Sequence, residues 1–460
     1  MPEDKLDIED YHQRKSSINP DGHRYKIRIA DVAGRFQKRK VAVFLLLLVF
    51  YAVVPWLNYK GHPVILIDIL HRQFYLFGNS YNAQDFYLVF FLISGVLFTL
   101  FYITSVAGRL WCGYACPQTV FLEGVYRKIE RLIEGPKANQ LLLAKSPWTL
   151  IKISKWLLKH SLYLVTSAVV AHIFLSYFVS LESLLGWMLG SPRDHWIAFS
   201  WVMAMTLIMY GNFAWFREQL CLIVCPYGRI QSALIDDDTF IIGYDSKRGE
   251  PRGKKSDTDR GDCINCRRCV DVCPTGIDIR EGLQLECVGC ANCVDACDEI
   301  MVKVGQKTGL VRYDSYNGFE GKTRRILRPR IYLYTVLFLI GMMVFSFFLY
   351  KRSSFEANIL RLSDVPYEFV GNKIRNQFKI HLINKGTQNE TYRIDFHQFD
   401  SMHVTLPINN IVLKSMGGRQ VPFFVDMDKE DYKKDTTITV DVHKLGNGEK
   451  KQFEVKFLGP

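Results

Sequence analysis

The chain has 460 residues, a formal net charge of +12 and a mean hydropathy close to zero, at +0.02. This length exceeds that of one ordinary domain, so we expect several domains. The basic charge would suit a nucleic-acid surface, but no basic fold interleaved with aromatic residues accompanies it. The sequence also lacks a P-loop and a dinucleotide-binding glycine motif, so no ATP, nicotinamide or flavin site is indicated.

Five apolar windows without Asp, Glu, Lys or Arg predict membrane-spanning helices. Each is 19 to 23 residues long, enough to cross a hydrocarbon core of about 30 Å. Buried helices of a large soluble protein are the alternative, but basic residues flank one side of every window, as at membrane helices. No small-residue cleavage site follows the first window, so we expect it to be retained. The windows are Val41–Tyr59, Phe86–Gly108, Ser161–Leu181, His195–Phe216 and Ile331–Tyr350.

The distribution of basic residues predicts the orientation of these helices. Loop 109–160 carries nine Lys and Arg residues, whereas the loop between the third and fourth windows carries only Arg193. Because Lys and Arg favour the cytoplasmic side, we expect the N-terminus and every cysteine to face the cytoplasm. With five helices, the segment after Tyr350 is then periplasmic. The prediction is a multi-pass protein of a bacterial inner membrane.

The predicted organisation follows from these windows. Residues Leu141–His160 mix Leu, Ile and Trp with Lys, which indicates an interfacial amphipathic helix before the third span. We expect a basic cytoplasmic segment (1–40), a four-helix membrane region (41–216) with cytoplasmic loop 109–160, a cytoplasmic cysteine-rich domain (217–330), a fifth helix (331–350) and a periplasmic domain (351–460).

Eight of the twelve cysteines form two runs with one spacing, C-x₂-C-x₂-C-x₃-C. This is the ligand spacing of a two-cluster bacterial ferredoxin, in which the fourth cysteine of each run binds the other cluster. We therefore predict two [4Fe–4S] clusters. One would be held by Cys263, Cys266, Cys269 and Cys297, and the other by Cys287, Cys290, Cys293 and Cys273.

Other uses of these eight cysteines fit the spacing less well. Four disulfides would need an oxidising compartment and looser spacing. Two Cys₄ zinc sites remain an alternative, although the triplet spacing is typical of clusters. Pro274 follows the first run as in ferredoxins, whereas Asp298 takes the place of a second proline. A domain this small has little core, so removal of iron is expected to unfold it.

The other four cysteines form two Cys-x₃-Cys-Pro motifs, each directly after a predicted span: Cys112 and Cys116 before Pro117, and Cys221 and Cys225 before Pro226. Proline suits the first position of a helix, so Cys116 and Cys225 are expected at helix N-termini, where the helix dipole favours a thiolate. Four thiolates at one depth could converge on Cu(I), zinc or an iron–sulfur cluster. Buried apolar cysteines or reversible dithiols are the alternatives.

His172 lies in the middle of the third predicted span. A polar side chain at that depth is a candidate functional residue, here a metal ligand or a proton relay. Hydrogen bonding to a helix is the alternative use.

The last part of the chain, from Ser353 to Pro460, alternates polar and apolar residues in short segments separated by Gly and Asn turns. This pattern predicts an immunoglobulin-like β-sandwich. Such a domain could dock a partner or act as a passive cap, and the fold alone does not decide between them. The expected strands are Gln377–Ile383, Thr391–Phe396, His403–Leu406, Gln420–Val425, Thr436–Val442 and Gln452–Phe457.

Taken in order, these motifs resemble the CcoG/FixG/RdxA family of cytochrome c oxidase accessory proteins, over nearly the full length. The resemblance rests on Trp111-Cys-Gly-Tyr-Ala-Cys-Pro-Gln-Thr-Val-Phe, Cys225-Pro-Tyr-Gly-Arg-Ile-Gln, the two ferredoxin runs, Arg328-Pro-Arg before the last span and the C-terminal β-domain. More general membrane polyferredoxins share only the cysteine motifs.

The resemblance implies reduction of Cu(II) to Cu(I) for the copper site of a cbb3-type oxidase. The eight ferredoxin cysteines would then be cluster ligands, and Cys112, Cys116, Cys221 and Cys225 would handle copper or pass electrons to it. The implied partners are the oxidase and its copper-assembly factors, and a homo-oligomer is compatible with the sequence.

Two other functions stay open at this point. The protein could conduct electrons from quinol to a periplasmic reductase, or act as a scaffold for oxidase assembly without redox chemistry. In either redox function the electrons come from a cytosolic donor or from membrane quinol.

Overall fold

The structure is a computed structural model that describes residues 26–59, 62–69, 72–82, 85–254, 256–362, 365–397, 402–434 and 436–460. Most of the segment expected at 1–40 lies outside the described residues. The chain divides into two compact units. Unit 1 consists of Met1–Trp56 and Phe91–Met343, and unit 2 consists of Leu57–Phe90 and Val344–Pro460.

Among the described residues, five helices are long and apolar enough to cross a membrane, so the predicted fold class is confirmed. They are α2 with η1 (Arg35–Val53 and Val54–Trp56), α3 (Phe86–Ala107), α8 (Leu150–Leu175), α10 with η4 (Trp196–Gly211 and Asn212–Phe216) and α16 (Pro329–Tyr350). Most of their apolar side chains are exposed, as expected of surfaces that face lipid.

The third helix starts earlier than the hydropathy predicted. Thr149 caps α8 by accepting a hydrogen bond from the Lys152 amide at 3.3 Å, and the helix then runs without a break to Leu175. The expected interfacial helix is therefore split. Its first part belongs to α7 (Lys137–Lys145), and its second part is the first turns of α8. Lysine is a good helix former, so the charged turns of α8 need not break the helix.

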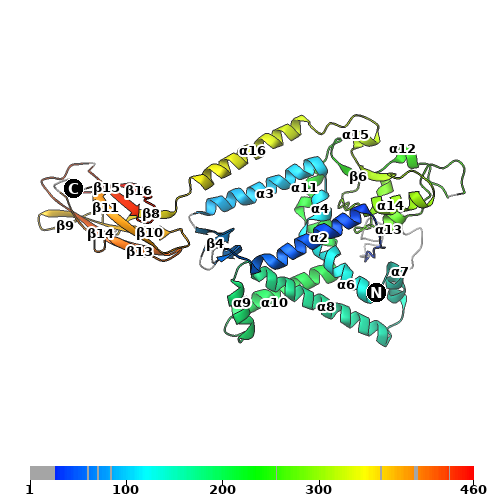
Figure 1. Cartoon of the computed structure of the whole chain (residues 1–460), viewed down its shortest axis with the longest axis horizontal. Coiled ribbons are helices and arrows are strands. Elements are labelled where there is room, and N and C mark those ends of the chain that lie inside the picture. Colours follow the sequence, from blue (N-terminus) through cyan, green and yellow to red (C-terminus); the bar gives the residue numbers. More distant parts are fainter. Residues whose placement is uncertain are drawn as a thin grey trace. The chain divides into compact units, whose positions relative to one another are not determined.

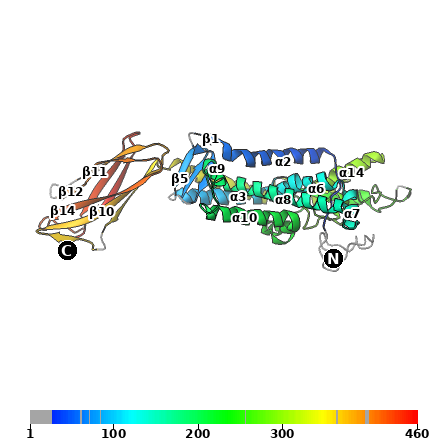
Figure 2. The same cartoon turned by 90° about the horizontal axis from the view of Figure 1, so that it is seen from below.

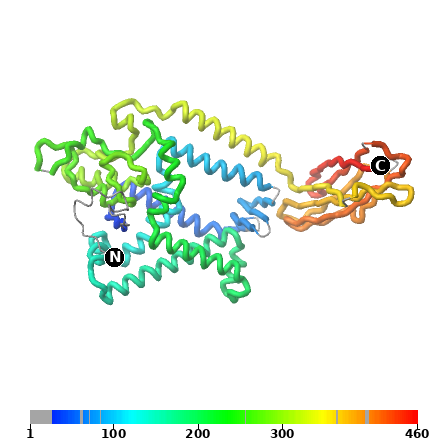
Figure 3. The backbone as a smooth tube through the Cα atoms, turned by 180° about the vertical axis from the view of Figure 1, so that it is seen from behind, coloured from blue at the N-terminus to red at the C-terminus, as the bar shows by residue number. Residues whose placement is uncertain are grey.

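In unit 1, α8 and α10 run side by side (Figure 3), as do α3 and α16, where Tyr102 Oη lies 3.2 Å from Thr335 Oγ1. The ends of several helices meet the cysteine-rich domain (Figure 1). Arg328, just before α16, donates to the carbonyl of Ser105 near the end of α3.

The amino end of α2 is capped by a residue far along the chain. The Asp295 carboxylate accepts from the Phe36 amide at 3.2 Å and from the Gln37 amide at 2.7 Å. Gly34 precedes the helix, and a Cβ atom at this position would overlap Cγ of Asp295. Glycine is therefore required where the carboxylate approaches the backbone.

The cysteine-rich domain of unit 1 is built from short elements. Strands β6 (Ile241–Tyr244) and β7 (Val311–Asp314) pair antiparallel, and the short helices between them include α12 (Ser246–Gly249), α13 (Arg268–Asp271), η6 (Ile279–Glu281) and α14 (Asn292–Lys303). A small apolar core surrounds the cysteines: Ile242, Val270, Ile277, Ile279, Val294 and Val311.

The C-terminal part of unit 2 is a two-sheet β-sandwich, seen in part in Figure 2. Within the described residues, one sheet has the order β12-β14-β10-β8, with β9 beside β10, and the other has the order β13-β11-β15-β16. The strands are β8 (Phe355–Arg361), β9 (Glu368–Val370), β10 (Lys373–Asn384), β11 (Glu390–His397), β12 (Met402–Thr405), β13 (Asn410–Leu413), β14 (Gly418–Asp428), β15 (Thr437–Lys444) and β16 (Lys450–Lys456).

Unit 2 also holds a small antiparallel sheet before α3, formed by β3 (Ile65–Asp68), β4 (Gln73–Leu76) and β5 (Asn79–Asn82). The fully buried Asp85 pairs with Lys385 at 2.9 Å and with Arg352 at 3.0 Å. These ion pairs join residues next to the small sheet to the sandwich.

Candidate functional site

The two ferredoxin runs have the same backbone shape. In the first run Asn265 and Arg267 have φ angles of 54° and 56°, and in the second run Gly289 and Ala291 have φ angles of 66° and 59°. Each pair flanks the second cysteine of its run. Left-handed residues among right-handed ones turn successive amide N–H groups toward one point, which is how a backbone nest holds anionic sulfur clusters. The sequence repeat is therefore also a structural repeat.

The structure brings the eight cysteines together in two sets. Cys263, Cys266, Cys269 and Cys297 line one cavity, closed on one side by Tyr244 and Arg280. Cys273, Cys287, Cys290 and Cys293 line a second cavity, whose wall also includes Cys269. These are the two ligand sets expected for a pair of exchanged ferredoxin runs, and Cys269 lies between them.

Burial makes these thiols hard to ionise without a metal. It raises the pKa of Cys290 to about 11 and that of Cys287 and Cys297 to about 12. A buried group that gains charge needs a counter-charge, which iron supplies to a thiolate. The cysteine sets, their apolar walls and the two backbone nests together fit [4Fe–4S] clusters.

Both Cys-x₃-Cys-Pro motifs end in a cysteine that caps a new helix, as predicted. Cys116 precedes α5 (Pro117–Phe121), and Cys225 lies between η5 (Leu220–Val224) and α11 (Pro226–Leu234). Burial raises the pKa of Cys116, and the amides of Gln118 and Thr119 only partly offset this. The expected effect of the helix terminus is present, but burial outweighs it.

A shared backbone feature precedes both motifs. Gly108 and Arg217 have φ angles of 57° and 54°, and each stands four positions before the first cysteine of its motif. A left-handed residue at the end of a membrane helix turns the chain, so the same backbone conformation precedes both motifs. Sequence reasoning missed Arg217, because an arginine carries no signal for this conformation.

The four thiols of these motifs lie near one another in unit 1. Burial raises the pKa of Cys221 to about 12, with further contributions from Cys116, Cys112 and Cys225. Burial likewise raises the pKa of Cys112 to about 11, and its Sγ lies 3.2 Å from the amide nitrogen of Gln231. Among the described side chains, no three His, Cys, Asp or Glu residues are already placed around a single metal ion.

His172 is hydrogen-bonded within its own helix, since its Nδ1 lies 2.7 Å from the Ala168 carbonyl oxygen. No group of three ligating side chains includes it in the described part of the chain.

The first membrane motif is in direct backbone contact with the second cysteine cavity. A Cβ atom on Gly113 would lie 2.8 Å from the Gly289 carbonyl oxygen and 2.9 Å from the Cys290 Cα atom. Arg109 reinforces this contact by donating to the carbonyls of Cys287 at 3.2 Å and of Gly228 at 2.8 Å. No side chain separates the two sites at this point. Neither Arg109 nor Gly113 was recognised in the sequence, because the contact is made by distant segments.

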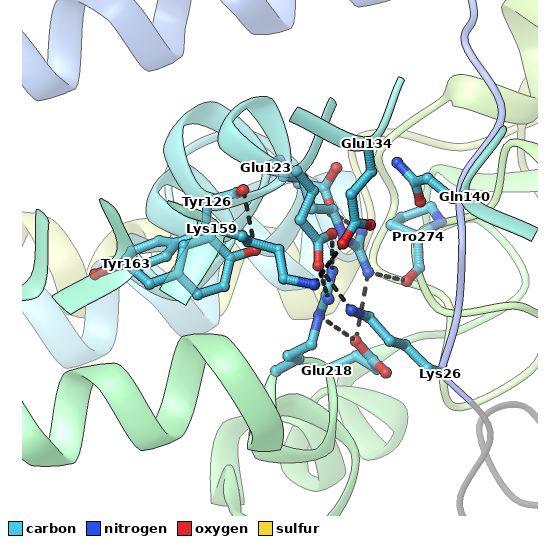
Figure 4. A network of polar contacts seen from close by, with 12 residues as sticks. Lys26, Glu123, Tyr126, Glu134, Gln140, Lys159, Tyr163, Glu218 and Pro274 are labelled. Carbon is cyan, nitrogen blue, oxygen red and sulfur yellow. Dashed lines mark hydrogen bonds and ion pairs between the residues drawn. The ribbon is translucent and has the colours of Figure 1, made fainter. Parts of the chain in front are cut away.

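A buried ion network that includes Lys26 and Glu218 lies beside these motifs (Figure 4). Glu130 accepts from the Arg217 guanidinium at 2.7 and 3.1 Å and pairs with Lys26 at 2.9 Å. Burial would raise the pKa of the Glu130 carboxyl, but Arg217 and Lys26 outweigh burial and hold this pKa well below its usual range. Arg127 continues the network to Glu218 at 3.3 Å and to the Pro274 carbonyl at 3.1 Å. The network thus joins the second motif to the loop after Cys273.

Family models match three parts of the chain. A 4Fe-4S dicluster domain matches residues 216–316, a 4Fe-4S binding domain matches residues 88–136, and a model described as an IG-like fold at the C-terminal of FixG matches residues 345–460. With the five apolar helices, these matches define a multi-pass membrane protein that carries iron–sulfur clusters for electron transfer.

Curated relatives then identify the family. Protein RdxA of Cereibacter sphaeroides is 36% identical over 379 residues, which cover 79% of this chain and 80% of RdxA. Protein RdxB of the same organism is 36% identical, over 79% and 80% of the two chains. Nitrogen fixation protein FixG of Rhizobium meliloti is 32% identical, over 78% and 77%. The chain belongs to the FixG/RdxA family.

A solved structure is also similar to part of the chain. The crystal structure of a FixG-related protein from Vibrio parahaemolyticus is 16% identical and covers 23% of this chain and 97% of its own, with a TM-score of 0.21.

Proposed function

We propose that this protein is a cupric reductase, which passes electrons from two [4Fe–4S] clusters to copper bound at the Cys-x₃-Cys-Pro thiols. The observation that carries the proposal is the backbone contact of Gly113 with Gly289 and Cys290, which leaves no side chain between the two sites. The clusters, when bound, would supply electrons one at a time, which matches the one-electron change from Cu(II) to Cu(I).

The residues of the chain have distinct parts in this function. Cys263, Cys266, Cys269 and Cys297 would hold one cluster, and Cys273, Cys287, Cys290 and Cys293 the other; the cavities they line support this division. Arg109, just before the first Cys-x₃-Cys-Pro motif, donates hydrogen bonds to the carbonyls of Cys287 and Gly228 and so positions the second cysteine run beside both motifs.

Copper is the substrate at Cys112, Cys116, Cys221 and Cys225. Each thiol that binds copper releases its proton, because the thiolate is the ligand. Soft thiolates bind Cu(I) better than harder donors do, so the site favours the reduced product. Each Cu(II) gains one electron, and no bond of the protein other than S–H breaks.

We further propose that the protein lies in the bacterial inner membrane, with the N-terminus and clusters cytoplasmic and the β-domain periplasmic. The asymmetry of Lys and Arg between loops supports this orientation. We also propose a role in copper-site assembly of a cbb3-type oxidase, which is the role that the resemblance to the CcoG/FixG/RdxA family implies.

The test uses the full-length protein with reconstituted clusters, which are reduced with dithionite and freed of excess dithionite by gel filtration before Cu(II) and a chromogenic Cu(I) chelator are added. We expect Cu(I) to form only slowly in the variant with Cys112, Cys116, Cys221 and Cys225 all changed to Ser, while its clusters are still reduced. Two matched variants that change one pair each show whether both motifs are needed. Equal Cu(I) formation by the fourfold variant and the wild type would disprove the copper site.

A second candidate concerns what the four thiols hold. The match of residues 88–136 to a 4Fe-4S binding domain favours a third cluster at this place. Iron analysis of the same variants separates the two: the fourfold variant loses one cluster's worth of iron if the thiols hold a cluster, and loses none if they handle copper.

A further inference from the structure

A cavity of about 250 Å³ lies in unit 1, and its wall extends from apolar residues of α2 to Asn292 of the second cysteine run. Residues of α2, of η3 (Leu122–Tyr126), of α6 (Arg127–Glu134) and of the segment 27–32 line it. Figure 4 shows Glu123 and Gln140 of its wall, near the buried ion network.

The wall of the cavity is apolar on its membrane side. Val41, Phe44, Leu45 and Leu48 of α2 line it, and Leu45 is 62% exposed on the surface of a helix that is apolar enough to face lipid. Gly124 faces this side: a Cβ atom there would lie 3.4 Å from Cδ2 of Phe44. An amphiphilic molecule could therefore enter with its apolar part toward the bilayer.

The other side of the cavity is polar, and hydrogen bonds link it to residues next to the cysteines of the second set. Lys40 donates to Asn292, which stands between Cys290 and Cys293 and itself donates to the Val272 carbonyl at 3.2 Å. Arg127, paired with Glu123, donates to the carbonyl of Pro274, the residue after Cys273. An occupant of the cavity is thus separated from the second cluster site by single side chains.

Several polar atoms of this wall have no partner in the described part of the chain. They are the acceptor Gln37 Oε1 and the donors Arg127 Nε and Arg131 Nη1. The side chain of Arg127 is only 9% exposed, so its unpaired Nε is a costly feature unless a ligand meets it. A molecule that both donates and accepts hydrogen bonds would therefore satisfy these polar atoms.

A hydroquinone meets these requirements, and a phospholipid phosphate does not. A phosphate has no proton to donate to Gln37 and would be repelled by Glu123 and Glu130 in the same wall. Three of the five cations that line the cavity already have partners: Arg127 has Glu123, Arg131 has Asp31, and Lys40 donates to Asn292. A neutral headgroup with hydroxyl groups fits both the polarity and the charge.

We infer that this cavity is a quinol-oxidising site that loads the clusters with electrons. Both O–H bonds of the quinol would break, two oxidised clusters held by the eight ferredoxin cysteines would each accept one electron, and the product would be the quinone. The two protons pass in turn to the Glu123 carboxylate, whose side chain is 14% exposed and so can release them to water. Quinol would then be the electron donor for the proposed function. Only the later transfer of these electrons to copper rests on that function.

The experiment measures binding and electron transfer separately in the cluster-loaded, full-length protein. Calorimetry in detergent gives the affinity for a short-chain quinone, and the absorbance of the clusters reports their reduction by the matching quinol. Gly124→Leu places a side chain against Phe44 inside the cavity. Gly95→Leu is the matched control, since a Cβ atom at Gly95 meets nothing within 4 Å.

We expect Gly124→Leu to weaken quinone binding about tenfold or more and to abolish reduction by quinol, with reduction by dithionite unchanged. Gly95→Leu should behave like the wild type in all three measurements. Glu123→Gln, which keeps the shape of the wall, should still bind quinone but slow the reduction by quinol, because the proton acceptor is gone.

Unchanged quinone affinity in Gly124→Leu would overturn the inference, as would a phospholipid that co-purifies with the wild type, is lost in Gly124→Leu and is not displaced by quinone. Failure here is distinguishable from failure of the proposed function. If quinol does not reduce the clusters but dithionite still drives Cu(I) formation, only the donor site is wrong. If quinol reduces the clusters and no Cu(I) forms, only the cupric reductase is wrong.

Discussion

At the scale of single residues, Arg217 explains how a strained backbone is stabilised beside the second thiol motif. Its φ of 54° places a non-glycine residue in the left-handed region, which costs about 1–3 kcal/mol. The guanidinium is almost fully buried and makes a two-pronged pair with Glu130. Gly108 occupies the equivalent place before the first motif without strain. The same left-handed backbone conformation is thus adopted by a glycine before the first motif and, before the second, by an arginine whose side chain is paired with Glu130.

Glu130→Gln tests this anchoring. We expect the free energy of unfolding to fall by about 3–5 kcal/mol, because the buried Arg217 loses its main counter-charge. Glu299→Gln, at an exposed i,i+4 pair with Lys303, is the control and should change stability by about 0.5 kcal/mol or less. Thermal unfolding in detergent measures both, and equal melting temperatures for the two variants would refute the role of Glu130.

The same pair predicts a pH profile. The pKa of Glu130 is lowered in the folded state, so its stabilisation is complete above the ordinary value of 4.5 and is lost only as the pH falls below it. The stability gap between wild type and Glu130→Gln should therefore stay constant from about pH 7 to pH 5. Lys26, whose pKa burial lowers to about 8, keeps its proton over this range. A gap that shrinks toward pH 5 would show that Glu130 titrates there.

At the scale of elements, the junction of α4 (Leu110–Tyr114) with the loop before α14 depends on the missing side chain of Gly113. Alanine is compatible with the helical backbone here, but its Cβ atom would overlap Gly289 and Cys290. The overlap must push the thiol motif and the second cluster loop apart.

Gly113→Ala is therefore expected to cost about 1–3 kcal/mol of stability and to slow reoxidation of the reduced clusters by Cu(II). Gly186→Ala, where a Cβ atom meets nothing within 4 Å, serves as the control and should reoxidise at the wild-type rate. Stopped-flow absorbance of the clusters measures the rate. A wild-type rate in Gly113→Ala would contradict electron transfer across this junction.

Local elements were largely predictable from the sequence, and contacts between distant segments were not. Proline after cysteine predicted the starts of α5 and α11, and polar–apolar alternation predicted β10, β11, β12, β14, β15 and β16. Strands β8, β9 and β13 were missed, as was the small sheet β3-β4-β5, since these strands are short or lack clear alternation. The cysteine spacing predicted which cysteines line the same cavity. The contact of Gly113 with Gly289 and the cavity lined by α2 and η3 each bring together segments that are far apart in the sequence, so no local pattern predicts them.

At the scale of the whole molecule, two kinds of core hold the chain. The sandwich of unit 2 has a continuous apolar core that includes Phe355, Phe378, Tyr392, Phe423 and Val440. The cluster domain has only a thin apolar layer around its cysteines, so bound iron supplies much of its stability.

Removal of iron is therefore expected to loosen one part of the protein and leave the other intact. After chelation, limited proteolysis of the full chain should cut within residues 245–320, while residues 355–457 persist as a stable fragment. Phe378→Ala should give the reverse pattern, because it opens the sandwich core at a cost of about 3–5 kcal/mol and leaves the cysteines untouched. Mass spectrometry of the fragments decides the matter, and a protease-resistant iron-free cluster domain would contradict it.

The cap on α2 has a consequence for the order in which the protein matures. The amino end of α2 is synthesised well before the carboxylate that caps it, which belongs to Asp295 on the helix that carries Cys293 and Cys297. Chains are made from the N-terminus, so α2 waits through the synthesis of three more membrane helices before its partner exists. Its end is secured only when that later helix is folded. The amino end of α2 is thus completed only after α14 has been made, although the rest of α2 precedes α14 in the chain.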